Sequence, residues 1–272
     1  MTEPLLRVRS GGWSRRQGLA ALLALACWQG ARADDARATV KVGFLRHYEP
    51  FSFVDARGQL QGFDVDVMAR LCEVLQLRME PVVDGLSGLA QRLQRGELAW
   101  LGNQLLTTPE NRRQFDFVRP AYASIQLSGV QHEDDPRDFL SLDDLVGKRL
   151  GVLAHTGMEE QARGVLGKTV KPYGQIEQAL QDLAQRKLDM VLEENLIADY
   201  HIERLQLPVK VTAPFAAPLP VGLAVRKGDR ETSDRLSQHV RKILQDGSLR
   251  RISEQWFGYD VSRARTSHAS PD

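Results

Sequence analysis

The sequence has little cysteine and no excess of charge of either sign. Of its 272 residues, two are cysteines, and 36 Lys and Arg residues are balanced by 35 Asp and Glu residues. The formal net charge is therefore +1, so the protein lacks the excess of positive charge that a nucleic-acid-coating protein needs. No run of Lys or Arg with interleaved aromatic residues occurs either. We expect a globular protein whose partners do not include nucleic acid.

A hydrophobic run long enough to cross a membrane is also missing. The apolar run at residues 19–28 would span about 15 Å as a helix, whereas a bilayer core is about 30 Å thick. Arginines precede this run, and Ala31-Arg32-Ala33 follows it, as in a secretory signal with a small-residue cleavage site. We therefore expect residues 1–33 to be a cleaved export signal, and the mature chain to be periplasmic and not membrane-spanning.

Removal of this signal would leave Cys72 as the only cysteine, so no intramolecular disulfide is expected. Cys72 shares a helical stripe with Met68 and Leu71, which favours packing in the core over a reactive thiol. Cys27 follows a poor lipidation motif, and Arg15-Arg16 lies in an incomplete twin-arginine pattern. Both alternatives stay open, but ordinary soluble export is favoured.

Strong catalytic signatures are absent. The sequence contains no Gly-x-Ser-x-Gly, no His-Glu-x-x-His, no phosphate-binding glycine-rich loop and no Cys-x-x-Cys, and its six histidines show no metal-ligand spacing. We expect no metal and no cofactor, and catalysis by a nucleophile or by zinc has little support.

Hydrophobic periodicity instead predicts two β-α-β-α-β units of nearly equal length. The first runs from a strand at 40–44 to a strand at 98–102, and the second from 150–153 to 189–192. This order predicts an α/β fold with two lobes and mainly parallel sheets. Extended segments near 118–130 and 213–225 would connect the lobes, and an amphipathic helix would then end at Gly247. Because small-molecule sites favour such interfaces, we expect a ligand cleft between the lobes.

Two candidate ligand residues follow predicted strands. Tyr48 comes after the first strand, where an aromatic face can stack on a ligand or cover a cation; Phe51 and Phe53 are expected in the core. Glu193-Glu194 follows the last strand of the second unit, where a carboxylate can pair with a ligand ammonium. The alternative is a solvated helix start, where acidic residues suit the helix dipole.

Two further segments are typical of helix or turn starts. Thr107-Thr108-Pro109-Glu110 and His155-Thr156-Gly157, followed by Glu159, would leave backbone N–H groups free to bind an anion. His155 itself can hydrogen-bond a ligand. Simple helix capping, with an exposed loop histidine, is the alternative for both segments.

At these residues the chain resembles the family 3 bacterial extracellular solute-binding proteins, the polar-amino-acid receptors of ABC importers. The matching motifs cover about residues 39–258 in family order. They are Tyr48-Glu49-Pro50-Phe51-Ser52-Phe53, Gly62-Phe63-Asp64-Val65-Asp66, Thr108-Pro109-Glu110, Phe115-Asp116-Phe117, Gly147-Lys148-Arg149-Leu150-Gly151-Val152, Gly222-Leu223-Ala224-Val225-Arg226-Lys227-Gly228-Asp229, Asp246-Gly247-Ser248 and Trp256-Phe257-Gly258.

The resemblance implies a type II periplasmic-binding-protein fold, with two α/β lobes joined by two crossover strands. Lobe 1 would comprise 39–123 and 217–258, lobe 2 would be 124–216, and 259–272 would be a disordered tail. It also implies a monomer that captures a small polar solute and an ABC permease partner in the inner membrane. The expected ligand-binding residues are Tyr48, Gln104, Thr107, Thr108, Asn111, Arg112, His155, Thr156, Gly157 and Glu194.

The chain departs from the family pattern where the ligand carboxylate is bound. The resemblance implies an Arg three residues after Thr108, but Asn111 stands there, with Arg112 and Arg113 alongside. An Asn cannot replace the charge of a bidentate Arg. Glu194, in place of an Asp, keeps the ammonium-binding charge. The sequence therefore favours an amine-bearing or otherwise unusual small polar solute.

Two alternative functions stay open. Cyclohexadienyl dehydratases resemble these binding proteins, and in such an enzyme Glu193 or Glu194 would be a general acid. The chain could also sense a ligand for a separate membrane signalling protein.

Overall fold

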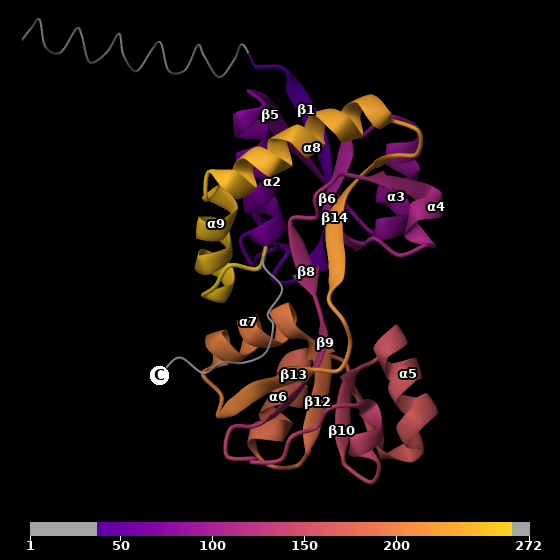
Figure 1. Ribbon diagram of the computed structural model, residues 1–272, viewed down its shortest axis with the longest axis vertical. Coiled ribbons are helices and arrows are strands. Elements are labelled where there is room, and N and C mark those ends of the chain that lie inside the picture. The colour runs from indigo at the N-terminus through magenta and orange to yellow at the C-terminus, as the bar shows by residue number, and fades with distance from the viewer. Residues whose placement is uncertain (1–36, 263–272) are drawn as a thin grey trace, which may run out of the picture.

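The computed structural model describes residues 37–262, which form two α/β lobes stacked along the long axis of the molecule (Figure 1). The predicted export signal lies outside the described residues. Each lobe has one main sheet, and the chain passes between the sheets twice, from β8 to β9 and from β13 to β14. The predicted two-lobe fold with two crossovers is confirmed. No helix among residues 37–262 is long and apolar enough to cross a membrane.

The main sheet of lobe 1 has the strand order β5-β1-β6-β14-β7, with β8 also paired to β14. Its strands are β1 (Thr39–Leu45), β5 (Arg78–Asp84), β6 (Trp100–Leu106), β7 (Phe115–Phe117), β8 (Ala123–Ile125) and β14 (Leu219–Arg226). The first three are parallel and the last three pair antiparallel. The expectation of mainly parallel sheets therefore holds only for β1, β5 and β6. Strand β14, which brings the chain back from lobe 2, runs in the opposite direction to β6.

Helices cover both faces of this sheet (Figure 1). They are α2 (Phe63–Val74), α3 (Leu86–Gln94), α4 (Asn111–Gln114), α8 (Arg230–Gln245) and α9 (Ser248–Phe257). A small sheet of β2 (His47–Tyr48), β3 (Ser52–Val54) and β4 (Leu60–Gln61) lies next to the start of α2. Cys72 is 2% exposed in the core with Met68 and Leu71, as its helical stripe predicts, and burial raises the pKa of its thiol to about 11.

Lobe 2 repeats the arrangement with a five-stranded sheet in the order β11-β10-β12-β9-β13. Its strands are β9 (Leu127–His132), β10 (Leu150–Leu153), β11 (Val170–Tyr173), β12 (Met190–Glu194) and β13 (Val209–Pro214). Its helices are α5 (Gly157–Leu166), α6 (Ile176–Ala184) and α7 (Asn195–Leu205), with short 3₁₀ turns at Leu142–Leu145 and Gly167–Thr169. Here too the central strands are parallel, and β9 pairs antiparallel with both of its neighbours.

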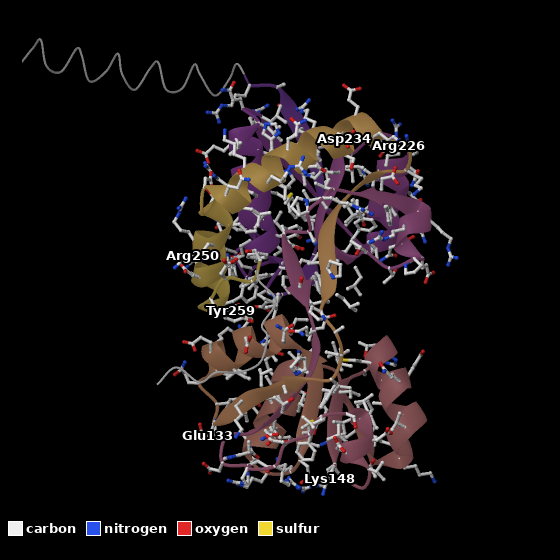
Figure 2. The ribbon with its side chains drawn as sticks, viewed as in Figure 1. Glu133, Lys148, Arg226, Asp234, Arg250 and Tyr259 are labelled. Atoms are coloured by element: carbon white, nitrogen blue, oxygen red, sulfur yellow. The ribbon has the colours of Figure 1, made fainter. Side chains whose placement is uncertain are left out.

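Helix α7 of lobe 2 contacts lobe 1. Leu196 is part of the lobe 1 core cluster, and the Tyr200 hydroxyl donates to Glu49 Oε1 at 2.9 Å. Tyr259, which lies near the junction of the lobes (Figure 2), donates its hydroxyl to Asp199 of α7 at 2.6 Å. These contacts join the lobes along one side.

The structure corrects the predicted disordered tail at its beginning. Val261 is 2% exposed within the lobe 1 core cluster, and Tyr259 makes the hydrogen bond to α7. The polar composition of 259–272 gave no indication of these contacts, because only one valine and one tyrosine make them within residues 259–262. The rest of the predicted tail lies outside the described residues.

Candidate functional site

The junction of the two lobes brings Tyr48 and Glu194 close together. Tyr48 ends β2 of lobe 1, and its ring packs on the buried Phe51 ring with centroids 4.9 Å apart. Glu194 ends β12 of lobe 2 and begins α7. Burial raises the pKa of the Tyr48 hydroxyl well above its ordinary value, and the nearby charges of Glu194, Asp64 and Glu193 raise it further. The Tyr48 hydroxyl of lobe 1 therefore lies within electrostatic range of two carboxyl groups of lobe 2.

Of the two adjacent glutamates of β12, Glu193 is buried and Glu194 is partly buried, and neither is ion-paired to a basic side chain within residues 37–262. Glu193 is 2% exposed, and its Oε1 accepts the backbone N–H of Glu194 at 2.8 Å. The Oε2 atoms of both residues are buried and lack a hydrogen-bond partner among residues 37–262. Burial raises the pKa of Glu193 to about 8 and that of Glu194 to about 7. Such groups gain strongly from a cation that supplies the missing hydrogen bonds.

Lobe 1 contributes a third buried carboxyl, in the first turn of α2. Asp64 is fully buried, and both of its oxygens are paired: the Tyr122 hydroxyl donates to one at 2.7 Å and the Gln104 backbone N–H to the other at 2.8 Å. Burial raises the pKa of Asp64, while these hydrogen bonds lower it. The network fixes β6 against α2.

Gln104, expected to bind ligand, is 4% exposed, and neither its side-chain oxygen nor its nitrogen has a hydrogen-bond partner among the described residues. A buried amide without partners is costly in a folded protein. Because its backbone N–H is bonded to Asp64, the residue lies beside the cluster of Tyr48, Asp64 and the two glutamates. Because the Gln104 side chain also lies near enough to Asp64 to lower the pKa of that carboxyl, ligand binding by Gln104 stays a prediction.

The expected anion-binding segment of lobe 1 uses its polar groups internally. The Thr107 hydroxyl donates to the Pro220 carbonyl at 3.2 Å, and the Thr108 hydroxyl accepts the Asn111 N–H at 3.2 Å. The Asn111 side-chain nitrogen donates to the Leu106 carbonyl at 2.8 Å. Arg112 donates to the Thr107 carbonyl at 2.8 Å. These hydrogen bonds hold the turn that leads into α4, and ligand binding by these residues stays a prediction.

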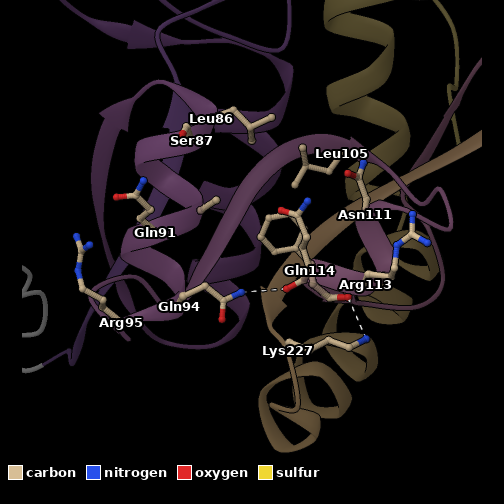
Figure 3. Close-up of a pocket in the computed structure, with 12 residues that line it drawn as sticks. Leu86, Ser87, Gln91, Gln94, Arg95, Leu105, Asn111, Arg113, Gln114 and Lys227 are labelled. Carbon is tan, nitrogen blue, oxygen red and sulfur yellow. Dashed lines mark hydrogen bonds between the residues drawn. The ribbon is translucent and has the colours of Figure 1, made fainter.

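Arg113 does not take the place of an arginine at position 111 either. It lines a groove of about 990 Å³ between α3 and α4, together with Asn111, Leu105 and Lys227 (Figure 3). A hydrogen bond from Gln94 to the Gln114 carbonyl, 2.9 Å long, crosses this groove. Neither arginine of α4 is hydrogen-bonded or ion-paired to Tyr48 or Glu194 among the described residues.

The expected helix start in lobe 2 is also a capped terminus. The Thr156 hydroxyl accepts the Glu159 N–H at 3.2 Å and donates to the Leu153 carbonyl at 2.8 Å, so the predicted N-cap is present. The His155 N–H donates to the Glu159 carboxylate at 2.8 Å, and the His155 and Gly157 side of the turn is exposed. Within residues 37–262 no hydrogen bond or ion pair links this turn to Tyr48 or Glu194.

Residue reasoning from the sequence did not place Asp64 or Tyr122 in the site, and it named Glu193 only as an alternative to Glu194. Asp64 and Asp66 both lie in the first turn of α2, where acidic residues are expected simply to complement the helix dipole, and Tyr122 lies in a predicted crossover. The Glu-Glu pair at the end of an apolar strand was a signal of a site, but it gave no indication that Glu193 would be buried, because acidic residues are mostly exposed. No group of three or more His, Cys, Asp or Glu side chains arranged to bind a metal occurs in the described part of the chain.

Comparison with known proteins agrees with this architecture. Residues 40–259 match the family described as bacterial extracellular solute-binding proteins, family 3. The chain belongs to this family. The resemblance carried by the sequence motifs is thereby confirmed, and the protein is a solute-binding protein.

Several relatives of this solute-binding protein are named for the amino acid that they bind. It is 28% identical over 228 residues to the L-cystine-binding protein TcyJ of Escherichia coli (strain K12), covering 84% of this chain and 85% of that protein. It is 28% identical to the L-arginine-binding protein of Pseudomonas aeruginosa, covering 82% and 89%. The unliganded open L-cystine solute receptor of Neisseria gonorrhoeae superposes with a TM-score of 0.72 at 26% identity, covering 86% and 98%.

Proposed function

We propose that this solute-binding protein captures a small amine-bearing or amino-acid-like solute in the periplasm and delivers it to an ABC permease of the inner membrane. Two observations support the proposal: the buried Oε2 atoms of Glu193 and Glu194 in lobe 2 lack hydrogen-bond partners among residues 37–262, and the charges of these residues raise the pKa of the Tyr48 hydroxyl in lobe 1. The cystine- and arginine-binding relatives support the amino-acid class.

The charge of the site favours a cation. Glu193 and Glu194 have no basic partner, and Asp64 lies nearby. A ligand ammonium would donate to the free Oε2 atoms, lie against the Tyr48 face and lower the pKa of both glutamates toward ordinary values. Because its contacts come from both lobes, such a ligand binds the closed arrangement better than the open one and shifts the population toward closure.

Titration calorimetry of the purified protein with lysine, arginine, ornithine, cystine and glutamate tests the proposal. We expect the cationic amino acids to bind and glutamate not to bind. Glu194→Gln keeps the shape of the side chain but removes its charge, so affinity for the cationic ligands should fall about 30-fold or more.

Glu203→Gln is the matched control, because Glu203 is an exposed acid on the same helix, α7, and should leave affinity unchanged. Failure of every amine to bind, or equal affinities for Glu194→Gln and the unmodified protein, would contradict the proposal.

A second candidate is a dehydratase-like enzyme, favoured by the pKa of Glu194 near 7, since a carboxyl that holds its proton at neutral pH can act as a general acid. Assay of prephenate and arogenate turnover tests it. Product formation that Glu194→Gln abolishes would favour the enzyme over the binding protein.

A further inference from the structure

Helix α7 packs into the hydrophobic cores of both lobes. Leu196 is part of the lobe 1 core cluster, and Ile197 and Tyr200 pack against the same cluster. Ala198 belongs to the lobe 2 cluster, with Ile202 packed against it. Residues three or four apart lie on the same face of a helix, so one face of α7 contacts lobe 1 and another contacts lobe 2. The helix is therefore shared by the two lobes.

Two consecutive residues of α7 also form hydrogen bonds with lobe 1. The Tyr200 hydroxyl donates to Oε1 of Glu49, in the turn between β2 and β3, at 2.9 Å. Asp199 Oδ2 accepts the hydroxyl of Tyr259, which packs against the lobe 1 core cluster just after α9, at 2.6 Å. Hydrogen bonds to an ionised carboxylate are stronger than those between neutral groups. Two such bonds therefore cross the junction at neighbouring positions of one helix.

Further contacts of Tyr200 and Glu49 surround the first of these bonds. The Arg204 guanidinium lies 3.6 Å from the same Glu49 oxygen and donates to Glu177 of α6 at 3.0 Å. The Tyr200 ring lies 6.3 Å from the Trp256 ring of α9, measured between centroids. Burial, together with the hydrogen bond to Glu49, raises the pKa of Tyr200 to about 12, so this hydroxyl keeps its proton at neutral pH. None of these contacts requires a ligand.

The same two segments carry the candidate ligand residues. Glu49 directly follows Tyr48, and Glu194 is the N-cap residue of α7. The start of α7 is also bound to the first crossover, because the Asn195 N–H donates to the Gln126 carbonyl at 2.9 Å and the Asn195 side-chain oxygen accepts the Gln126 N–H at 2.8 Å. Contacts that hold α7 against the turn between β2 and β3 therefore also fix the position of one candidate residue relative to the other.

We propose that Tyr200 and Tyr259 are positioning residues, whose hydrogen bonds across the junction hold α7, and with it Glu194, in place relative to Tyr48 before a ligand binds. This inference rests on the proposed function for the role of the site, and it adds that the site is preorganised by contacts outside it. The apparent affinity of a protein falls with the fraction of molecules in the binding-competent arrangement. Loss of the two hydroxyls therefore weakens binding although no ligand contact is removed.

The distance between spin labels on the two lobes tests the proposal in the ligand-free protein. Gln91→Cys on α3 and Gln161→Cys on α5 place the labels at exposed positions, on helices that lie on the other side of the crossover strands from α7 (Figure 1). Cys27→Ser removes a competing cysteine, and Cys72 is too buried, with too high a thiol pKa, to be labelled readily. Pulsed electron paramagnetic resonance then measures the distribution of distances.

The variant Tyr200→Phe/Tyr259→Phe removes both hydroxyls and keeps both rings. We expect its distance distribution to be at least twice as wide as that of the unmodified protein, because α7 is no longer hydrogen-bonded to lobe 1. Its affinity for lysine and arginine, measured by titration calorimetry, should fall about fivefold, since fewer molecules are in the competent arrangement.

Tyr173→Phe is the matched control. The Tyr173 hydroxyl donates to Asp182 at 2.8 Å, so this change also removes a hydroxyl–carboxylate bond, but one that lies within lobe 2. It should destabilise the protein in urea as each of the other tyrosine changes does, while the distance distribution and the ligand affinity stay unchanged. The control therefore separates positioning from a general loss of stability.

Three results would overturn the role of Tyr200 and Tyr259: a distribution in Tyr200→Phe/Tyr259→Phe as narrow as in the unmodified protein, equal broadening in Tyr173→Phe, or tighter ligand binding by the double variant, which would mean that these contacts oppose closure. If lysine binding still depends on Glu194 in those cases, the proposed function stands. Broadening in the double variant, with no amine bound by the unmodified protein, would support the positioning of α7 and refute the proposed function.

Discussion

Both lobes bury carboxyl groups near the junction between them, but the two lobes differ in how many hydrogen bonds these carboxyl groups receive. In lobe 1, Asp64 receives a hydrogen bond on each oxygen, from Tyr122 and from the Gln104 backbone. In lobe 2, Glu193 and Glu194 each keep a buried oxygen without a partner. The contrast separates a carboxyl that holds the fold together from carboxyls that are free to bind a ligand.

The same distinction applies to the hydroxyl and amide side chains at the two predicted anion-binding turns. Thr107, Asn111 and Thr156 all donate to backbone carbonyls of their own lobe, whereas Gln104 has no partner on either side-chain atom. A residue type suited to a ligand is therefore weak evidence of a site until its local hydrogen bonds are known. Buried polar atoms without partners are the stronger indication.

The largest effect on stability is expected from Asp64→Ala. This change leaves the Tyr122 hydroxyl and the Gln104 N–H buried without an acceptor, and it should lower the free energy of unfolding by about 3 kcal/mol. Tyr122→Phe removes one of the two hydrogen bonds and should cost about 1 kcal/mol. Urea unfolding measures both. Equal losses in the two variants would mean that Asp64 is not the centre of this network.

Glu193→Gln should change how stability depends on pH. The pKa of Glu193 in the folded protein is about 8, against an ordinary 4.5, so between these values the folded protein holds a proton that the unfolded chain has released. Stability then falls as pH rises through this window, by at most about 1.4 kcal/mol for each pH unit.

Urea midpoints at pH 5 and pH 8 test this pH effect. Glu193→Gln should be less sensitive to pH and more stable than the unmodified protein at pH 8, with Glu194 accounting for the dependence that remains. An unmodified protein that is more stable at pH 8 than at pH 5, with the trend unaltered by Glu193→Gln, would refute the buried, protonated state of this residue.

The smallest effect is expected at the capped turn of lobe 2. Thr156→Ala removes the N-cap of α5 and should lower the free energy of unfolding by about 1 kcal/mol, while ligand affinity stays within twofold. Thr156→Ser keeps the cap and serves as the control. A large loss of affinity in Thr156→Ala with normal stability would show that this turn binds the ligand. It would contradict the distinction drawn here between polar side chains that are hydrogen-bonded within their lobe and buried polar atoms that lack partners.

Much of the fold could be predicted from the sequence because the two βαβαβ units depend on local hydrophobic periodicity. The helix that starts at Gly157 and the strand at 150–153 begin where the pattern indicates. Helix α9 was missed although Ser248–Phe257 has an apolar face that includes Leu249 and Phe257, because the preceding helix was taken to end the folded part of the pattern at Gly247. The antiparallel strands were missed because periodicity contains no strand direction.

Within the candidate site, sequence reasoning identified Tyr48 and Glu194 from their position after strands. It could not tell that Asn111 and Arg112 would bond to the carbonyls of Leu106 and Thr107, because such bonds depend on the path of the backbone through α4. The roles of all these residues in ligand binding stay predictions for the variants above.

The sequence by itself determined the α/β class, the repeat of the two units, the family and the segments from which a ligand can be reached, because each depends on residue order and local pattern. Only the tertiary structure decided which polar atoms remain unpaired. Hydrogen bonding and burial depend on groups brought together from both lobes, such as Tyr48 against Glu194, and their separation along the chain gives no measure of that proximity.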